Sequence, residues 1–195
     1  MPESSDPYTY SGTDVLRNLF DICDPNHLAA FEANATAARL IELDAAPIVG
    51  RFDVAHLKAI HRYIFQDVYG WAGEFRTVNI SKSGHLFAVA AFIEPALQDV
   101  MGKLASEHLL KEADSQMFAE RAGFFLGEIN AVHPFRDGSG RAQREFIRQL
   151  AIEAGFLIDW SRVTREQMMA ASLESFKTGD SSGMASVIKL SMKSS

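Results

Sequence analysis

The chain has 195 residues, of which 47% are hydrophobic, enough for one domain over residues 1–195 with a sizeable core. Its formal net charge of −6 argues against binding along a nucleic-acid backbone, so no direct nucleic-acid ligand is expected. The single cysteine, Cys23, excludes an intrachain disulfide, and the sequence shows neither a leader pattern nor a membrane-spanning apolar stretch; we expect a cytoplasmic protein without membrane contact.

Apolar residues at helical spacing and residues that cap helices predict an all-α bundle. Residues 1–12 and 193–195 are expected to fray. His56 and His61 share one helix but are five residues apart, so we expect surface or core-edge histidines rather than a metal pair. The expected helices are 24–43, opened by Asp24 and Pro25; 53–65, opened by Asp53; 95–110; 115–132; 140–154; and one from Thr164 onward, where Thr164 and Gln167 form a capping box.

A short β-hairpin is expected over about residues 75–88, because residues 75–82 alternate as a strand does and Ser83-Gly84 can turn the chain. The open edge of a two-stranded hairpin can pair with an extended segment of a target protein. The alternative is a purely structural hairpin that caps the helical domain. The candidate positions for docking a target are Asn79, Ile80, Ser81, Lys82 and Leu86.

The segment from His133 to Arg144, HPFRDGSGRAQR, predicts a phosphate-binding loop. Proline after His133 favours the end of a helix there, and the glycine-rich turn that follows opens a new helix. Backbone N–H groups and the positive end of the helix dipole point out of such a turn, so the turn can hold an anion.

The side chains of this loop are suited to nucleotide chemistry. His133 can take a proton from a nucleophile, and Asp137 offers an oxygen ligand to Mg²⁺. Arg141 and Arg144 lie three residues apart, on one helix face, and can bind phosphate. Phe135 is expected to anchor the loop in the core. The alternative is a chance assembly of a turn, a structural histidine and solvated arginines.

The loop resembles the signature of the Fic family, H-P-F-x-(D/E)-G-N-G-R-x-x-R, and departs from it only at Ser139, where the family usually has Asn. The segments 68–84 and 6–18 are also similar to Fic segments, so the resemblance covers nearly the whole chain. It implies a Fic-fold bundle in which the hairpin is a flap beside the active-site loop. It assigns the general base to His133, Mg²⁺ to Asp137, and nucleotide binding to Asp137, Gly138, Ser139, Gly140, Arg141 and Arg144. For Ser139, we expect a hydroxyl that still donates to phosphate, with altered nucleotide positioning.

The resemblance also implies an activity, the transfer of AMP from ATP to a Tyr, Thr or Ser hydroxyl of a protein, with pyrophosphate released. Many Fic proteins carry an inhibitory (S/T)-x-x-x-E-(G/N) helix, and no Ser or Thr here is followed four residues later by Glu. The chain thus resembles Fic toxins that receive this helix from a small antitoxin protein, with Arg144 as its expected anchor. Relatives of that type modify the ATPase subunits of DNA gyrase and topoisomerase IV.

Two other functions stay open. A Fic-fold kinase would transfer the γ-phosphate, although the intact Gly138-x-Gly140-Arg141 cradle argues against that branch of the family. A weakly active Fic-fold binding protein would act by sequestering its partner, and Ser139 is its only support in the sequence.

Overall fold

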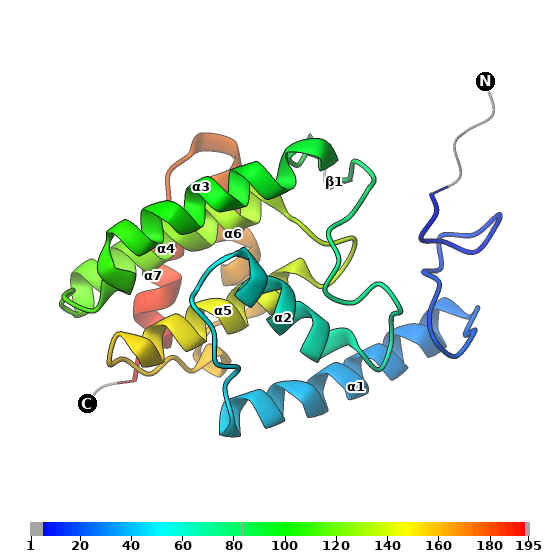
Figure 1. The fold of residues 1–195 in the computed structure, drawn as a ribbon, viewed down its shortest axis with the longest axis horizontal. Coiled ribbons are helices and arrows are strands. Elements are labelled where there is room, and N and C mark those ends of the chain that lie inside the picture. The colour runs from blue at the N-terminus through cyan, green and yellow to red at the C-terminus, as the bar shows by residue number, and fades with distance from the viewer. Residues whose placement is uncertain (1–5, 83, 194–195) are drawn as a thin grey trace.

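The computed structural model describes residues 6–82 and 84–193, and most of these are helical (Figure 1). The α-helices are α1 (Pro25–Ala45), α2 (Val54–Phe65), α3 (Ile93–Ser106), α4 (Ser115–Val132), α5 (Ser139–Glu153), α6 (Arg165–Thr178) and α7 (Ser182–Ser191), with short 3-10 turns at Ala90–Phe92, His108–Leu110 and Trp160–Arg162. None of the helices in the described ranges is long and apolar enough to cross a membrane.

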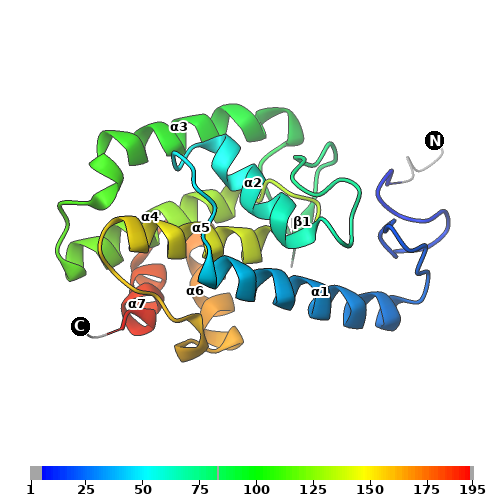
Figure 2. The same cartoon turned by 60° about the horizontal axis from the view of Figure 1, so that its bottom comes forward.

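Helix α4 lies at the centre of the bundle and packs against α3, α5, α6 and α7, while α2 packs against α5 and α1 packs against α2 (Figures 1 and 2). The contact between α4 and α7 is close: a Cβ on Gly123 would lie 2.5 Å from the backbone nitrogen of Ala185. The central position of α4 places its last turn, and the loop that follows, against the core.

The predicted helix starts at Asp24, Asp53 and Thr164 are confirmed, because each side chain accepts a hydrogen bond from a first-turn N–H group. The prediction of one helix from Thr164 onward is wrong. Gly179, with a φ of 74°, ends α6, and a separate helix, α7, follows. Helix α3 begins before Pro95 and ends at Ser106 rather than Leu110.

The hairpin is shorter than predicted. Strand β1 (Ser81–Lys82) pairs antiparallel with β2 (His85–Leu86), in the register Ser81 to Leu86 and Lys82 to His85. Residues 75–80 are not in a strand. Arg76 instead donates from its backbone N–H to the carbonyl of Pro134 and from its side chain to the carbonyls of His133 and Val78. Ser83, in the turn, lies outside the described residues.

The chain ends make tertiary contacts where the structure describes them, and their fraying stays a prediction. Asp6 accepts two hydrogen bonds from Arg136, and the N–H of Lys193 donates to the carbonyl of Leu157 at 2.9 Å. These tertiary contacts fix segments that composition alone predicts to be loose. Residues 1–5 and 194–195, included in the same prediction, lie outside the described residues.

Buried polar contacts hold the far end of α5. Arg148 pairs with Glu145 through two bonds of 2.8 Å and donates to the carbonyl of Leu43 at 2.7 Å. Oε1 of Gln149 lies 3.1 Å from Nε2 of His56, which is buried rather than at the surface or the core edge. Burial lowers the pKa of His56. Helix α5 is therefore fixed along its length by polar as well as apolar contacts.

Candidate active site

The loop between α4 and α5 begins and ends with residues in the left-handed region. His133 ends α4 with a φ of 46°, and its N–H donates to the carbonyl of Ile129 at 3.0 Å. Gly138 precedes α5 with a φ of 76°. The helix end at His133 and the glycine turn thus lie where the sequence predicts them. A positive φ is unusual for a residue other than glycine, so contacts around His133 must stabilise it.

Phe135 anchors the loop, with its side chain fully buried and its ring stacked on His61 at a centroid distance of 3.7 Å. His61 is buried, not at the surface. Its Nδ1 accepts from the N–H of Gly73 at 2.9 Å, so Nε2 carries the proton and donates to the carbonyl of Asp137 at 3.0 Å. Burial lowers the pKa of His61 to about 4, which keeps the ring neutral and preserves this pattern.

Arg76 joins the loop to the base of the hairpin. Its side chain is buried, and its Nε donates to the carbonyl of His133 at 2.9 Å. Its terminal nitrogens donate to the carbonyls of Val132 at 3.1 Å, Ala88 at 2.5 Å and Val78 at 2.7 Å. Four carbonyls from two segments thus share one guanidinium, which satisfies the backbone groups that a bent chain leaves unpaired.

The hairpin lies beside the candidate base. The ring of Phe87 stacks on the imidazole of His133, with centroids 4.0 Å apart and an interplanar angle of 16°. The N–H of Phe87 donates to the carbonyl of Ile80 at 3.2 Å, which closes the hairpin behind the two short strands. The orientation of His133 is therefore linked to the hairpin as well as to its own loop.

The candidate docking positions differ in their surroundings, and Ile80 is partly buried. Leu86, with 58% of its surface exposed, and the exposed Ser81 are accessible to a target. Asn79 is exposed as well, but its side chain accepts a bond from the N–H of Ala90 at 2.9 Å and so stabilises the hairpin. The placement of the Lys82 side chain lies outside what the structure describes.

Ser139 is buried, and its hydroxyl is used within the loop. Its Oγ accepts from the N–H of Phe135 at 3.1 Å and lies 3.3 Å from the carbonyl of the same residue. The hydroxyl of Ser139 is thus engaged with Phe135, and its contact with a phosphate stays a prediction. The backbone N–H groups of Ser139 and Gly140 remain in the first turn of α5, where no intrahelical acceptor precedes them.

Gly138 makes the tight turn possible in two ways. Its φ is one that glycine adopts without strain, and a Cβ at this position would lie 2.1 Å from the ring of Phe65. Its N–H donates to Oδ1 of Asp137 at 2.6 Å, so one carboxylate oxygen is fixed.

Asp137 is the candidate metal ligand. It is partly exposed, and no group of three or more His, Cys, Asp or Glu side chains able to hold a metal exists in the described part of the chain. Mg²⁺ commonly binds through one or two carboxylates together with the phosphates of a substrate and water. The single carboxylate of Asp137 fits this mode.

The two arginines of α5 differ in their surroundings. Arg141 donates to Glu32 at 2.5 Å and to Thr36 at 3.1 Å, and its guanidinium lies 4.5 Å from the centre of the Phe65 ring. Arg144 makes no ion pair with any residue of the described ranges. A Cβ on Gly140 would lie 3.4 Å from a terminal nitrogen of Arg144, so its guanidinium is close to the start of α5.

The pKa of Arg144 is lowered by its burial and by the positive charge of Arg141. An arginine keeps its proton even so, and a half-buried charge without a counter-ion is costly. A negatively charged ligand near the start of α5 would remove this cost. Of the two arginines that the sequence assigns to phosphate, Arg144 is the one that the structure leaves available.

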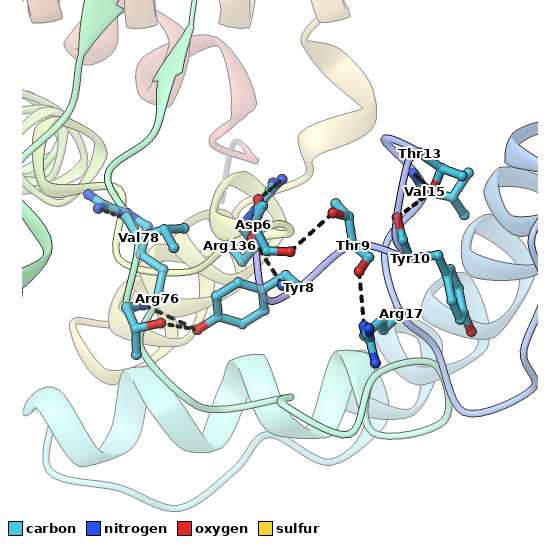
Figure 3. A network of polar contacts seen from close by, with 11 residues as sticks. Asp6, Tyr8, Thr9, Tyr10, Thr13, Val15, Arg17, Arg76, Val78 and Arg136 are labelled. Carbon is cyan, nitrogen blue, oxygen red and sulfur yellow. Dashed lines mark hydrogen bonds and ion pairs between the residues drawn. The ribbon is translucent and has the colours of Figure 1, made fainter. Parts of the chain in front are cut away.

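The segment of residues 6–17, called here the N-terminal strap, crosses the loop and the base of the hairpin (Figure 3). Oδ2 of Asp6 accepts from Nε and a terminal nitrogen of Arg136 at 2.9 and 2.7 Å. The hydroxyl of Tyr8 accepts from the N–H of Thr77 at 3.1 Å. Two loops far apart in the sequence are thus held by one segment.

The fold and this loop agree with a family assignment from sequence. The model of the Fic/DOC family matches residues 51–151, a range that contains α2, the hairpin and the loop from His133 to Arg144. The chain belongs to the Fic/DOC family.

The chain is similar to named members of this family. It is 45% identical over 186 residues to the protein adenylyltransferase VbhT of Bartonella schoenbuchensis, covering 95% of this chain but only 39% of VbhT. It is 40% identical to the probable protein adenylyltransferase y4lH of Sinorhizobium fredii, covering 94% of each. The crystal structure of the effector BepC from Bartonella tribocorum with bound AMPPNP superimposes with a TM-score of 0.91 and 28% identity, covering 96% of this chain and 97% of that one.

Proposed function

We propose that this Fic/DOC protein is a protein adenylyltransferase that transfers AMP from ATP to a Tyr, Thr or Ser hydroxyl of a target protein and releases pyrophosphate. The observation that carries the proposal is the position of Arg144: a half-buried guanidinium without an ion-pair partner in the described chain, next to the start of α5. The related BepC structure holds a bound AMPPNP, which supports a nucleotide as the ligand of this fold.

The phosphates are proposed to bind at the first turn of α5. The N–H groups of Ser139 and Gly140 and the positive end of the helix dipole attract an anion, and Arg144 offers a bidentate donor. Mg²⁺, held by Asp137 and the phosphates themselves, would neutralise further charge.

His133 is the proposed general base. It takes the proton from the target hydroxyl as that oxygen attacks the α-phosphorus; the bond from the α-phosphorus to the bridging oxygen breaks, and pyrophosphate leaves with the bond's electron pair. Phe87 and Arg76 hold His133 in the orientation that this step requires, through ring stacking and through its carbonyl. The backbone N–H groups of the cradle stabilise the charge that develops on the phosphate oxygens.

The hairpin is proposed to align the target. An extended segment of the target would add to the edge of β1 or β2 through main-chain hydrogen bonds, with Leu86 as an apolar contact. Because Phe87 of the same hairpin touches His133, a hydroxyl carried by that segment would be presented close to the base.

A toxin role is part of the proposal. Arg144 is open to a glutamate from a small antitoxin protein, whose Ser-x-x-x-Glu helix would occupy the guanidinium that the nucleotide needs. The ATPase subunits of DNA gyrase and topoisomerase IV are the first targets to test, and the lone Cys23 fits their cytoplasmic location.

In the test, the purified protein is incubated with ATP labelled at either the α- or the γ-phosphate, together with purified gyrase B subunit or bacterial lysate, and labelled target protein is measured. Label from α-ATP alone, lost in His133→Ala, is the expected result. His27→Ala, in an exposed histidine at the start of α1, is the matched control and should keep full activity.

Other patterns of label would overturn specific parts of the proposal. Label from γ-ATP alone would indicate a kinase. Label from α-ATP in lysate proteins other than gyrase B would overturn the proposed target but support the proposed reaction. Target binding that survives His133→Ala, with no label in the parent protein, would indicate a binding protein.

A further inference from the structure

Glu32, on α1, accepts hydrogen bonds on both of its carboxylate oxygens, one of them from Arg141 in the segment from His133 to Arg144, and the proposed reaction gives this residue no role. Its Oε1 accepts from Arg141 at 2.5 Å, and its Oε2 accepts from the hydroxyl of Tyr69. Thr36, one turn further along α1, accepts from the other terminal nitrogen of Arg141 at 3.1 Å. The side chains of Glu32 and Arg141 are only 13% and 25% exposed, so this ion pair is largely shielded from solvent.

We propose that Glu32 is a positioning residue for AMP transfer: it fixes Arg141, and through it the first turn of α5, so that Arg144 alone provides free positive charge for the phosphates. This inference rests on the proposed function. It also makes α1 part of the functional unit, although Glu32 lies outside the range 51–151 that the family model matches.

The contacts of Arg141 favour a fixed support over a phosphate ligand. Both terminal nitrogens point to α1, and one face of the guanidinium lies over the Phe65 ring. The same ring lies directly under Gly138, so Arg141, Phe65 and the glycine turn form one packed stack. Moving Arg141 to a phosphate would break the ion pair, a hydrogen bond and this packing together.

The charges around the loop support the same division of roles. Arg136 is neutralised by Asp6, and Arg141 by Glu32, while Arg144 pairs with no carboxylate of residues 6–82 and 84–193. A glutamate that competed with the nucleotide would be expected to pair with the available arginine. Glu32 instead pairs with the one that the fold already holds.

The experiment compares Glu32→Gln with the parent chain. The matched control is Glu42→Gln, which makes the same chemical change in a half-exposed ion pair with Arg39 on the same helix. Three quantities are measured: kcat and the KM for ATP in AMP transfer; the affinity for AMPPNP; and hydrogen exchange at the amides of Arg141 and Ala142, which both donate to the carbonyl of Gly138. Thermal unfolding shows that each variant is folded.

Glu32→Gln is expected to lower kcat about tenfold, because a small displacement of catalytic groups costs this much or more, and to change the KM for ATP by less than about threefold. The amides of Arg141 and Ala142 should exchange faster, and Glu42→Gln should change none of these quantities. If Glu32→Gln does not fold, Glu32→Asp, which keeps the charge but shortens the side chain, should show the same faster exchange.

Two results would overturn the proposal. Unchanged kcat and exchange would mean that Arg141 needs no counter-ion, and a gain in both AMPPNP affinity and kcat would make Glu32 a brake. Failure of the proposed function is distinguishable, because a parent chain that transfers no AMP still reports the role of Glu32 through hydrogen exchange.

Discussion

The guanidinium of Arg76 donates a hydrogen bond of 2.9 Å to the backbone carbonyl of His133, which lies 57 positions further along the chain. This contact explains how His133 keeps a left-handed backbone conformation at the end of α4, because its carbonyl cannot continue the helix and finds a charged donor instead. The same guanidinium donates to the carbonyl of Ala88, so one side chain connects His133 with the end of the hairpin.

Replacing Arg76 by lysine should therefore destabilise the fold as well as the site. A lysine keeps the charge but cannot match the planar fork that serves four carbonyls, and we expect a loss of about 3 kcal/mol in the free energy of unfolding. Urea denaturation measures this loss. Arg62→Lys, at an exposed position on α2, is the control and should stay within about 0.5 kcal/mol of the parent. Equal stability of both variants would contradict the structural role of Arg76.

The glycines that flank α5 separate backbone strain from close packing. Gly138 and Gly155 have φ values of 76° and 85°, but a Cβ on Gly138 would strike the Phe65 ring, whereas nothing lies within 4 Å of one on Gly155. Gly155→Ala should cost only the strain of a left-handed alanine, about 1 kcal/mol. Gly138→Ala should cost more than about 3 kcal/mol in urea denaturation, or else displace the loop and abolish AMP transfer. Similar, small losses at both sites would show that the ring moves aside.

The sequence predicts the helices and the loop because their signals are local. Caps such as Asp24 and Asp53 act within one turn, and the proline and glycines around the loop act on neighbouring bonds. The supports of the loop are not local. Glu32 reaches Arg141 across 109 positions, and Arg76 reaches His133 across 57, distances over which no pattern of a single sequence indicates a contact.

Ser139 and His61 show a second limit of such reading. The sequence shows that residue 139 is polar. It does not show that the serine hydroxyl accepts from the backbone N–H of Phe135 within the loop. His61 is expected at the surface or at the edge of the core, but it is fully buried, and two backbone partners satisfy its ring. Buried polar groups with tertiary partners are where the sequence was least informative.

Breaking the ion pair of Asp6 and Arg136 should lower the activity but change the stability of the fold only slightly. Both side chains are about one-quarter exposed, at 28% and 23%, so the pair should contribute less than about 1 kcal/mol to stability. The N-terminal strap nevertheless orients the loop next to Asp137, and we expect Asp6→Asn to lower kcat/KM about fivefold. Steady-state AMP transfer measures this change.

Two further variants control this prediction. Asp14→Asn changes an exposed carboxylate of the same strap and should have no effect. The exchange of charges in Asp6→Arg with Arg136→Asp should recover part of the activity lost in Asp6→Asn. An activity that falls equally in Asp14→Asn would indicate a general effect of charge rather than the ion pair.

The low pKa of His61 should make the fold less stable in acid. Its pKa is about 4 in the folded chain, against about 6.5 for an unperturbed histidine, because burial disfavours the charged ring. Between these two values the unfolded chain binds a proton that the folded chain does not, so the unfolded state gains stability as the pH falls. The stability that the neutral His61 contributes is fully present above pH 6.5. The loss in the free energy of unfolding should approach on the order of 3 kcal/mol near pH 4.

Urea denaturation from pH 8 to pH 4.5 measures this loss, and NMR of the imidazole gives the pKa of His61 directly. His61→Phe keeps a ring against Phe135 but removes the titrating group and its bonds to Gly73 and Asp137. It should be less stable than the parent at pH 7.5 and should lose less stability on acidification. An imidazole that titrates near pH 6.5 in the folded chain would contradict both the burial of His61 and its support of the loop.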